Sequence, residues 1–271
     1  MARIQGSKLF QLVLLAAVAV AAHAQTPAVA QGGVLNAANG IFPVTPGSLV
    51  SIYGTDLAGG LAQADTIPLS NSLNQVSVTL NGIPAPLLFV SQGQVNAQVP
   101  WNVLQSGTSG TVSIVVMNHG QPSSSQAVPI GPFSPGIFAI GNIAVAQNVV
   151  DASVAAPAGA IPGVETHPAT INDPYGLAIL CTGLGAVDSA IANGANSSDL
   201  LRRTTTTPTV LVGGQPVKVL FSGLSPQFVG VNQINVTLPP GTPTGDAVPL
   251  QISIGGIVTT NTITIAVQPQ Q

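Results

Sequence analysis

The chain has 271 residues, of which 45% are hydrophobic and only 5% are charged. This length is enough for two ordinary modules with sizeable cores, and the composition is unlike that of a disordered chain, which is poor in aliphatic residues and rich in charge. Five basic residues and a net charge of −3 cannot supply the positive surface that nucleic acid or an anionic membrane surface requires. Neither is expected as a partner.

Residues 1–24 have the pattern of a secretory signal peptide. Arg3 and Lys8 supply the positive start, an apolar run follows, and Ala22-His23-Ala24 is a small-x-small cleavage site. The apolar run is short and alanine-rich for a membrane span, and no later segment has 18 unbroken apolar residues. We therefore expect an exported protein, extracellular, cell-surface or periplasmic, whose mature chain begins at Gln25 and does not span the membrane.

The mature chain divides into four parts. Residues 25–32 have the composition of a flexible lead-in, and residues 269–271 that of a frayed tail. Between them the sequence predicts module one at 33–131 and module two at 132–268, joined near a Gly-Pro-Phe-Ser-Pro-Gly segment. Residues 151–172, rich in Ala, Pro and Gly, are expected to form a long loop of module two.

Apolar and polar residues alternate with period two along the mature chain, and helical periodicity is absent. The clearest segments are 75–80, 111–116, 248–254 and 262–267. Strands of this kind bury one face and leave the other in water, which is typical of antiparallel sandwiches. The sequence therefore predicts an all-β fold of two tandem immunoglobulin-like antiparallel β-sandwich modules.

An internal repeat supports this division. Residues 78–89 match 210–221 in turn dipeptide, following proline and Leu-Phe pair, and residues 94–100 match 233–239. The second copy carries seven extra residues before its last matching strand, around 224–230. Two copies of one fold are the simplest explanation.

Several stretches, in order, resemble a known family. They include Pro46-Gly-Ser-Leu-Val-Ser-Ile-Tyr-Gly-Thr-Asp-Leu57, Gly93-Gln-Val-Asn-Ala-Gln-Val-Pro-Trp101, Ser134-Pro-Gly-Ile-Phe138 and Thr182-Gly-Leu-Gly185. The chain thereby resembles the C-terminal domain family of uncharacterised secreted acidobacterial proteins, often called the Solibacter C-terminal domain. The modules also look like IPT/TIG-type immunoglobulin-like domains. The first resemblance implies a bacterial protein with no established activity, and the second implies a module that binds partners or acts as a spacer.

The sequence contains few residues that could act in catalysis. After signal cleavage only His119 and His167 remain, no Gly-x-Ser-x-Gly motif is present, and the eight acidic residues are scattered singly. His119 lies in an Asn-His-Gly segment that predicts an exposed hairpin turn. We therefore expect no catalytic residue and no enzyme, with a hydrolase as a distant alternative.

Metal and cofactor chemistry is equally unsupported. One cysteine, Cys181, cannot form a zinc site with two distant histidines, and its apolar context predicts a small buried core residue. We expect no metal ligand and no cofactor, although a loop calcium site built from a few of the acids and backbone carbonyls remains open.

Amide side chains form a row on the repeated strand of each module. The candidate ligand-binding residues are Gln94, Asn96, Gln98 and Trp101 in module one, and Gln233 and Asn235 in module two. Amides offer donors and acceptors without charge, which suits sugar hydroxyls or a polar protein surface. The alternative is structural: the amides satisfy backbone groups at a bulged strand or at the join between modules, and the tryptophan closes the core.

These patterns favour a non-enzymatic exported protein of the cell envelope or extracellular space that acts as an interaction or spacer module. Its partner would be a protein or polysaccharide surface. A carbohydrate-binding protein that uses the amide rows is the alternative function.

Overall fold

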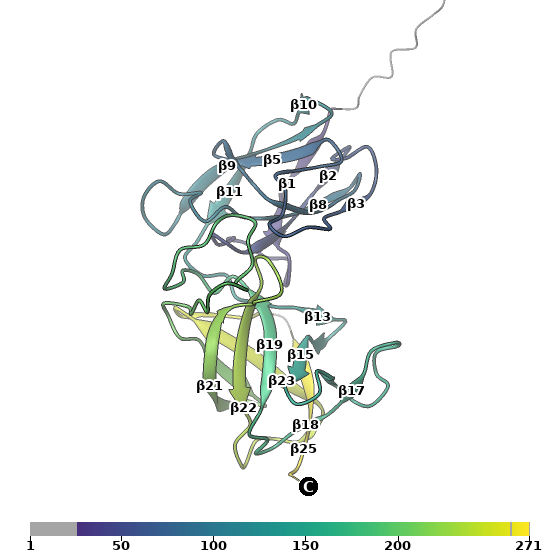
Figure 1. The fold of residues 1–271 in the computed structure, drawn as a ribbon, viewed down its shortest axis with the longest axis vertical. Coiled ribbons are helices and arrows are strands. Elements are labelled where there is room, and N and C mark those ends of the chain that lie inside the picture. Colours follow the sequence, from purple (N-terminus) through teal and green to yellow (C-terminus); the bar gives the residue numbers. More distant parts are fainter. Residues whose placement is uncertain (1–25, 261, 271) are drawn as a thin grey trace, which may run out of the picture.

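The computed structural model describes residues 26–260 and 262–270, and the predicted signal peptide lies outside them. In this part the chain is all-β, with two bodies of strands that follow each other along the long axis (Figure 1). The C-terminus lies at the far end of the second body (Figure 1). None of the described residues belongs to a helix of the length and apolarity that crossing a membrane would need.

Module one, taken here as residues 28–130, contains two sheets. Its strands are β1 (Ala28–Asn36), β2 (Leu49–Thr55), β3 (Ala62–Gln63), β4 (Ser72–Leu73), β5 (Val76–Leu80), β6 (Ile83–Pro84), β7 (Leu87–Val90), β8 (Gln94–Gln98), β9 (Gly110–Asn118), β10 (Gln121–Pro122) and β11 (Gln126–Ile130). One sheet has the order β1-β2-β8-β7-β3, and the other has the order β10-β9-β5-β4, with β11 on β9 and β6 on β5.

Module two, taken here as residues 136–268, repeats this plan. Its strands are β12 (Gly136–Ile137), β13 (Ala139–Ile140), β14 (Ile143–Ala144), β15 (Ala146–Asn148), β16 (Val154–Ala155), β17 (Thr166–His167), β18 (Ala169–Thr170), β19 (Leu177–Thr182), β20 (Thr209–Val212), β21 (Gln215–Leu224), β22 (Asn232–Thr237), β23 (Gly245–Ile254), β24 (Ile257–Val258) and β25 (Ile263–Gln268). Strand β21 pairs with β20 at its start and with β22 at its end, which links the two layers into one continuous ladder.

The apolar residues that alternate along the strands are buried, and the polar residues between them are more exposed. Val76, Val78 and Leu80 of β5 are fully buried, whereas Ser77 and Thr79 between them are half-exposed. Two large apolar clusters result among the described residues, one within 29–130 and one within 137–267, and a small third cluster contains Val154, Ala156 and Ile161. The predicted fold class, two tandem immunoglobulin-like antiparallel sandwiches, is confirmed.

The repeated sequences adopt the same pairing. Phe89 pairs with Asn96 in module one, and Phe221 pairs with Asn235 in module two. In each module a one-residue β-bulge, at Leu88 and at Leu220, immediately precedes the phenylalanine. The two copies that repeat in sequence therefore also have the same strand register and the same β-bulge.

The structure corrects the predicted lead-in. Residues 28–32 belong to β1, where Ala28 pairs with Thr55. The physical reason is that β2 would otherwise present an open edge, and pairing there also buries Val29. The segment 151–172 is likewise more than loop, because β16, β17 and β18 lie within it. The predicted division between 131 and 132 stays a prediction and lies between β11 and β12.

Cys181 is fully buried in β19, and this burial raises the pKa of its thiol well above the ordinary value. We predict that it does not react with Ellman's reagent in the native protein at pH 8 and reacts fully in denaturant. Rapid native modification at the rate of a free thiol would contradict the burial.

Candidate functional site

One end of the outer face of the β2–β8 pair is buried at the junction between the modules, and the other end is exposed to solvent. Gln94 and Asn96 are half-exposed, whereas Gln98, at the end nearer module two, is only 1% exposed. The junction loop, residues 183–208 between β19 and β20, covers that end and lies between the two bodies of strands (Figure 1). One row of amides thus has two different environments.

Gln98 is fully engaged by backbone groups. Its Nε2 donates to the Gly47 carbonyl at 3.2 Å, and its Oε1 accepts from the Gly194 amide at 2.7 Å. The Leu69 amide donates to the Gly194 carbonyl at 2.8 Å, so the same loop residue is bound twice by module one. Gln98 therefore faces the junction loop and is not available to a ligand in solution, as the structural alternative from the sequence allowed.

Trp101 also belongs to the junction. Its backbone amide donates to Asn193 Oδ1 at 2.8 Å, and Asn193 Nδ2 donates to Asn102 Oδ1 at 3.1 Å. Its indole lies flat against Gly47, where a Cβ would lie 2.2 Å from the ring, so only glycine fits. The indole Nε1 is buried with no hydrogen-bond partner among the described residues. Trp101 is thus not an open stacking platform.

The seven extra residues of the second repeat form a second junction contact. The sequence comparison places them around 224–230, which corresponds to the end of β21 and the insertion loop, residues 225–231 between β21 and β22. Thr182 Oγ1 accepts from the Leu49 amide at 3.1 Å and donates to the Gly230 carbonyl at 2.7 Å. A Cβ at Gly230 would lie 2.9 Å from the Leu49 side chain. The insertion that the sequence showed without explanation therefore closes on module one.

A third contact joins module one to the segment that connects it to module two. The fully buried Asn36 donates from Nδ2 to the Ser134 carbonyl at 2.7 Å. Its Oδ1 accepts from the Ala38 amide at 2.8 Å. These three contacts use uncharged groups that are largely buried, so salt cannot screen them as it screens surface ion pairs.

A buried arginine shapes the junction loop from within. Arg202 is only 6% exposed, although arginine is rarely buried unless it is paired. Its guanidinium contacts both carboxylate oxygens of Asp199, at 2.7 and 3.1 Å, and its Nε donates to the Ala190 carbonyl at 2.9 Å. The sequence did not predict a buried Arg202. Its partner Asp199 is close in the sequence, but the burial of the arginine depends on where the loop lies in the folded protein.

The remaining amides pair with each other. Gln94 Nε2 donates to Asn96 Oδ1 at 2.7 Å, and Gln233 Nε2 donates to Asn235 Oδ1 at 2.8 Å. Both pairs are half-exposed, at equivalent positions of the two modules. The structure thus brings four of the six predicted residues together as two equivalent pairs, on β8 and on β22.

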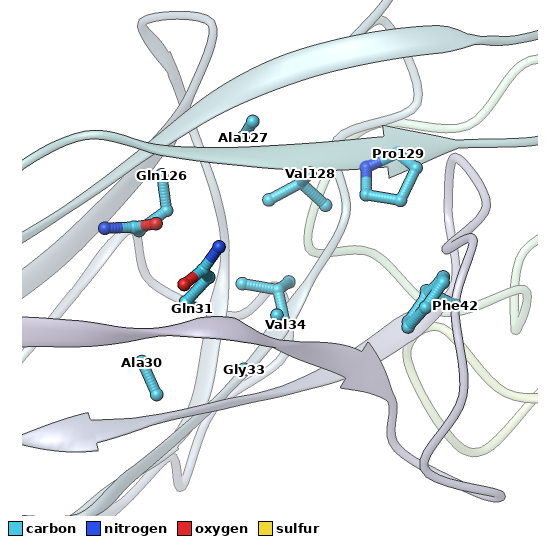
Figure 2. Close-up of a pocket in the computed structure, with 10 residues that line it drawn as sticks. Ala30, Gln31, Gly33, Val34, Phe42, Gln126, Ala127, Val128 and Pro129 are labelled. Carbon is cyan, nitrogen blue, oxygen red and sulfur yellow. The ribbon is translucent and has the colours of Figure 1, made fainter.

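A shallow slot opens at the free edge of module one, between β1 and β11 (Figure 2). Its volume is about 280 Å³, and Figure 2 shows Gln31 and Gln126 on the facing strands with Phe42 at one end. Pro129 removes one amide donor from this edge, and Val44 bridges the end of β11. This slot is a protected sheet edge with no charged lining residue.

An ion pair that the sequence did not predict lies in module two. His167 Nε2 lies 2.6 Å from Asp151 Oδ2, and Asp151 Oδ1 accepts from the amide and hydroxyl of Ser153 at 3.0 and 2.7 Å. The serine hydroxyl thus contacts the acid and not the imidazole, so the three residues do not form a nucleophile–base–acid chain. No group of three His, Cys, Asp or Glu residues gathers to hold a metal within residues 26–260 and 262–270.

Hydrogen bonds to neighbouring groups, together with the ion pair, shift the pKa values of both residues. The Ser153 amide, then His167 and the Ser153 hydroxyl, lower the pKa of Asp151 to about 2. The Pro168 carbonyl, then the Asp151 carboxylate, raise the pKa of His167. Both groups remain substantially exposed, so the pair is a local staple of the loop after β15 and contributes little to global stability.

Comparison with known proteins agrees with the fold of module one. The family model of the IPT/TIG domain matches residues 39–130. Among solved structures, the titin Ig tandem domains A164-A165 are 8% identical, covering 83% of this chain and 91% of theirs, with a TM-score of 0.21. Domains 5–6 of the S-layer protein SbsC are 12% identical, covering 90% of this chain and all of theirs, with a TM-score of 0.28. No curated protein matches. The narrower acidobacterial family stays a prediction.

We predict that Asp151→Asn lowers the pKa of His167, as measured by NMR titration of its imidazole protons. Because the folded pKa of His167 is raised and that of Asp151 is lowered, the ion pair contributes fully between pH 3.8 and pH 6.5 and is lost as the pH rises through the raised pKa of His167. It is also lost in acid, as the pH falls through about 2. His119→Gln assigns the remaining resonance, and an unchanged titration in Asp151→Asn would refute the pairing.

Proposed function

We propose that this chain is a non-enzymatic exported protein that acts as a rigid two-module spacer and interaction element of the cell envelope or extracellular space. The observation that carries the proposal is the junction, where Gln98 and Thr182 bond backbone groups across the two modules and Asn36 bonds the segment that connects them. A flexible tandem would not bury polar side chains between its modules, because buried polar groups need fixed partners.

The arrangement of the modules supports the same proposal. They follow each other along the long axis, so the chain advances from one end of the molecule to the other (Figure 1). Inter-domain interfaces within a chain permit relative motion by default unless they are extensive. Here loop 183–208 is hydrogen-bonded to Gln98 of the first sheet. Loop 225–231 lies against Leu49 at Gly230, and its Gly230 carbonyl accepts from Thr182, which also accepts from the Leu49 amide.

The immunoglobulin-like architecture fits an interaction or spacer role, and the IPT/TIG match in module one is consistent with it. A fold alone does not determine function. The proposal therefore depends on the junction geometry and on export, which can be tested separately.

We predict that Thr182→Val weakens the junction. The change keeps the shape of the side chain but leaves the Leu49 amide and the Gly230 carbonyl without their partner, which costs about 1–3 kcal/mol of unfolding free energy. Residual dipolar couplings measure the consequence. One alignment tensor should fit both modules of the wild type, and two should be needed in Thr182→Val combined with Gln98→Ala.

Thr209→Val is the matched control, because Thr209 is exposed on β20 away from the junction. It should leave the single tensor and the urea midpoint unchanged. Trp101 is the only tryptophan of the chain, so its emission reports the docking of the junction loop directly. A wild-type protein that itself needs two tensors would overturn the rigid spacer.

We predict export with cleavage after Ala24. Mass spectrometry of the exported protein should give Gln25 as the first residue, and Ala24→Arg should block processing because the cleavage site needs a small side chain. The control is Gln25→Ala, which should be processed normally. Full-length protein retained in the cytoplasm would overturn the export part of the proposal.

A further inference from the structure

The open part of the β2–β8 face in module one carries an aromatic residue that the amide row alone did not reveal. Tyr53 on β2 pairs directly with Gln94 on β8, so the two side chains share one face. Tyr53 is 42% exposed, and the neighbouring Gln94–Asn96 pair is half-exposed. Tyr53 therefore places an exposed ring beside a hydrogen-bonded amide pair.

The hydrogen bond between the two amides leaves some of their donors and acceptors free to bind a ligand. Gln94 Nε2 is held by Asn96 Oδ1 at 2.7 Å and reaches Ser51 Oγ at 3.5 Å. Asn96 Nδ2 and Gln94 Oε1 have no hydrogen-bond partner among the described residues, so two donor hydrogens and one acceptor of this half-exposed pair remain for a ligand. A pair of neighbouring hydroxyl groups, each both donor and acceptor, matches this arrangement.

The face has no charge to attract an ion. Residues 26–131 contain no Lys or Arg, and their only acids are Asp56 and Asp65. Asp56 lies beyond the far end of the face, where its Oδ1 accepts from Gln92 Nε2. An anionic polymer would meet no cation here and would be repelled by the acid, and no cluster of acids is present to attract a cationic one, which favours a neutral ligand.

The equivalent face of module two is built differently. Leu180 takes the place of Tyr53 opposite Gln233, and the Arg203 guanidinium covers the Phe221 ring, 5.1 Å from its centroid. The same amide pair is present there without an open ring beside it. Module two thus supplies an internal comparison for the contribution of the tyrosine.

The face also continues into a hollow at the junction. Leu49, which pairs with Gln98, and Leu88, at the bulge, line a space of about 270 Å³ together with Phe228 of the insertion loop. Phe228 is 48% exposed. The lining is mainly apolar and also includes Asp65, so a neutral chain-like ligand on the amide face can extend over a surface that both modules form.

We propose that Tyr53, Gln94 and Asn96 form a binding site for an uncharged polysaccharide, with the sugar ring on the tyrosine and its hydroxyls on the two amides. This inference rests on the proposed function, because it names the partner class of the interaction element. The amide pair fixes orientation, and the aromatic ring supplies contact area at little entropic cost.

The test is a neutral-glycan array followed by affinity electrophoresis of the mature chain in gels that contain the best neutral glycan or, as the anionic probe, alginate. The wild type should be retarded by the neutral polymer and not by alginate. Tyr53→Ala and Asn96→Ala should each weaken binding about fivefold to tenfold, as expected for the loss of one favourable contact. Tyr53→Phe, which keeps the ring, should stay within about twofold.

Asn235→Ala is the matched control, because it removes the equivalent amide of module two and should leave binding unchanged. Unchanged urea midpoints show that the variants are folded. No retardation by any neutral glycan, preferred binding to alginate, or an equal loss in Asn235→Ala and Asn96→Ala would overturn the site. A rigid wild-type tandem that binds no glycan would overturn this inference and leave the spacer, whereas glycan binding by a flexible tandem would do the reverse.

Discussion

The structure depends on hydrogen bonds to the polar groups that are buried where the two sandwiches meet. The chain has few charged residues, so uncharged side chains make these hydrogen bonds. Thr182 shows the constraint most clearly. Its hydroxyl accepts from the Leu49 amide of module one and donates to the Gly230 carbonyl of module two, so a single oxygen satisfies two backbone groups. Gln98 does the same with its two amide atoms. Neutral donors and acceptors of this kind keep their strength in salt, unlike exposed ion pairs.

Glycine makes the close approach possible. Gly47 admits the flat face of Trp101, and Gly230 admits the side chain of Leu49. A methyl group on Gly230 would press on Leu49 across the junction, whereas one on Gly47 would displace the Trp101 ring within module one. The missing side chain of Gly230 therefore contributes to the junction together with the hydrogen bonds of Thr182 and Gln98.

Duplication followed by divergence explains how one strand pattern serves two purposes. The Gln–Asn pair, the bulge and the following phenylalanine are the same in both modules. Module one places Tyr53 beside this pair, whereas module two places Leu180 there and covers Phe221 with Arg203. The insertion in module two, absent from module one, became part of the contact between them.

The sequence by itself determined the all-β class, the two immunoglobulin-like modules, the buried Cys181 and the turn at His119, because period-two alternation and turn residues are local signals. It also found the amides, but not which of them stay in solvent. Gln94 and Gln98 look alike in the sequence, and only the junction loop, which arrives from about 100 residues away, buries one and leaves the other open. The pairing of Asp151 with His167, the bond between Trp101 and Asn193, and the place of Tyr53 beside Gln94 were likewise decided by tertiary structure, since each joins residues that no local pattern connects.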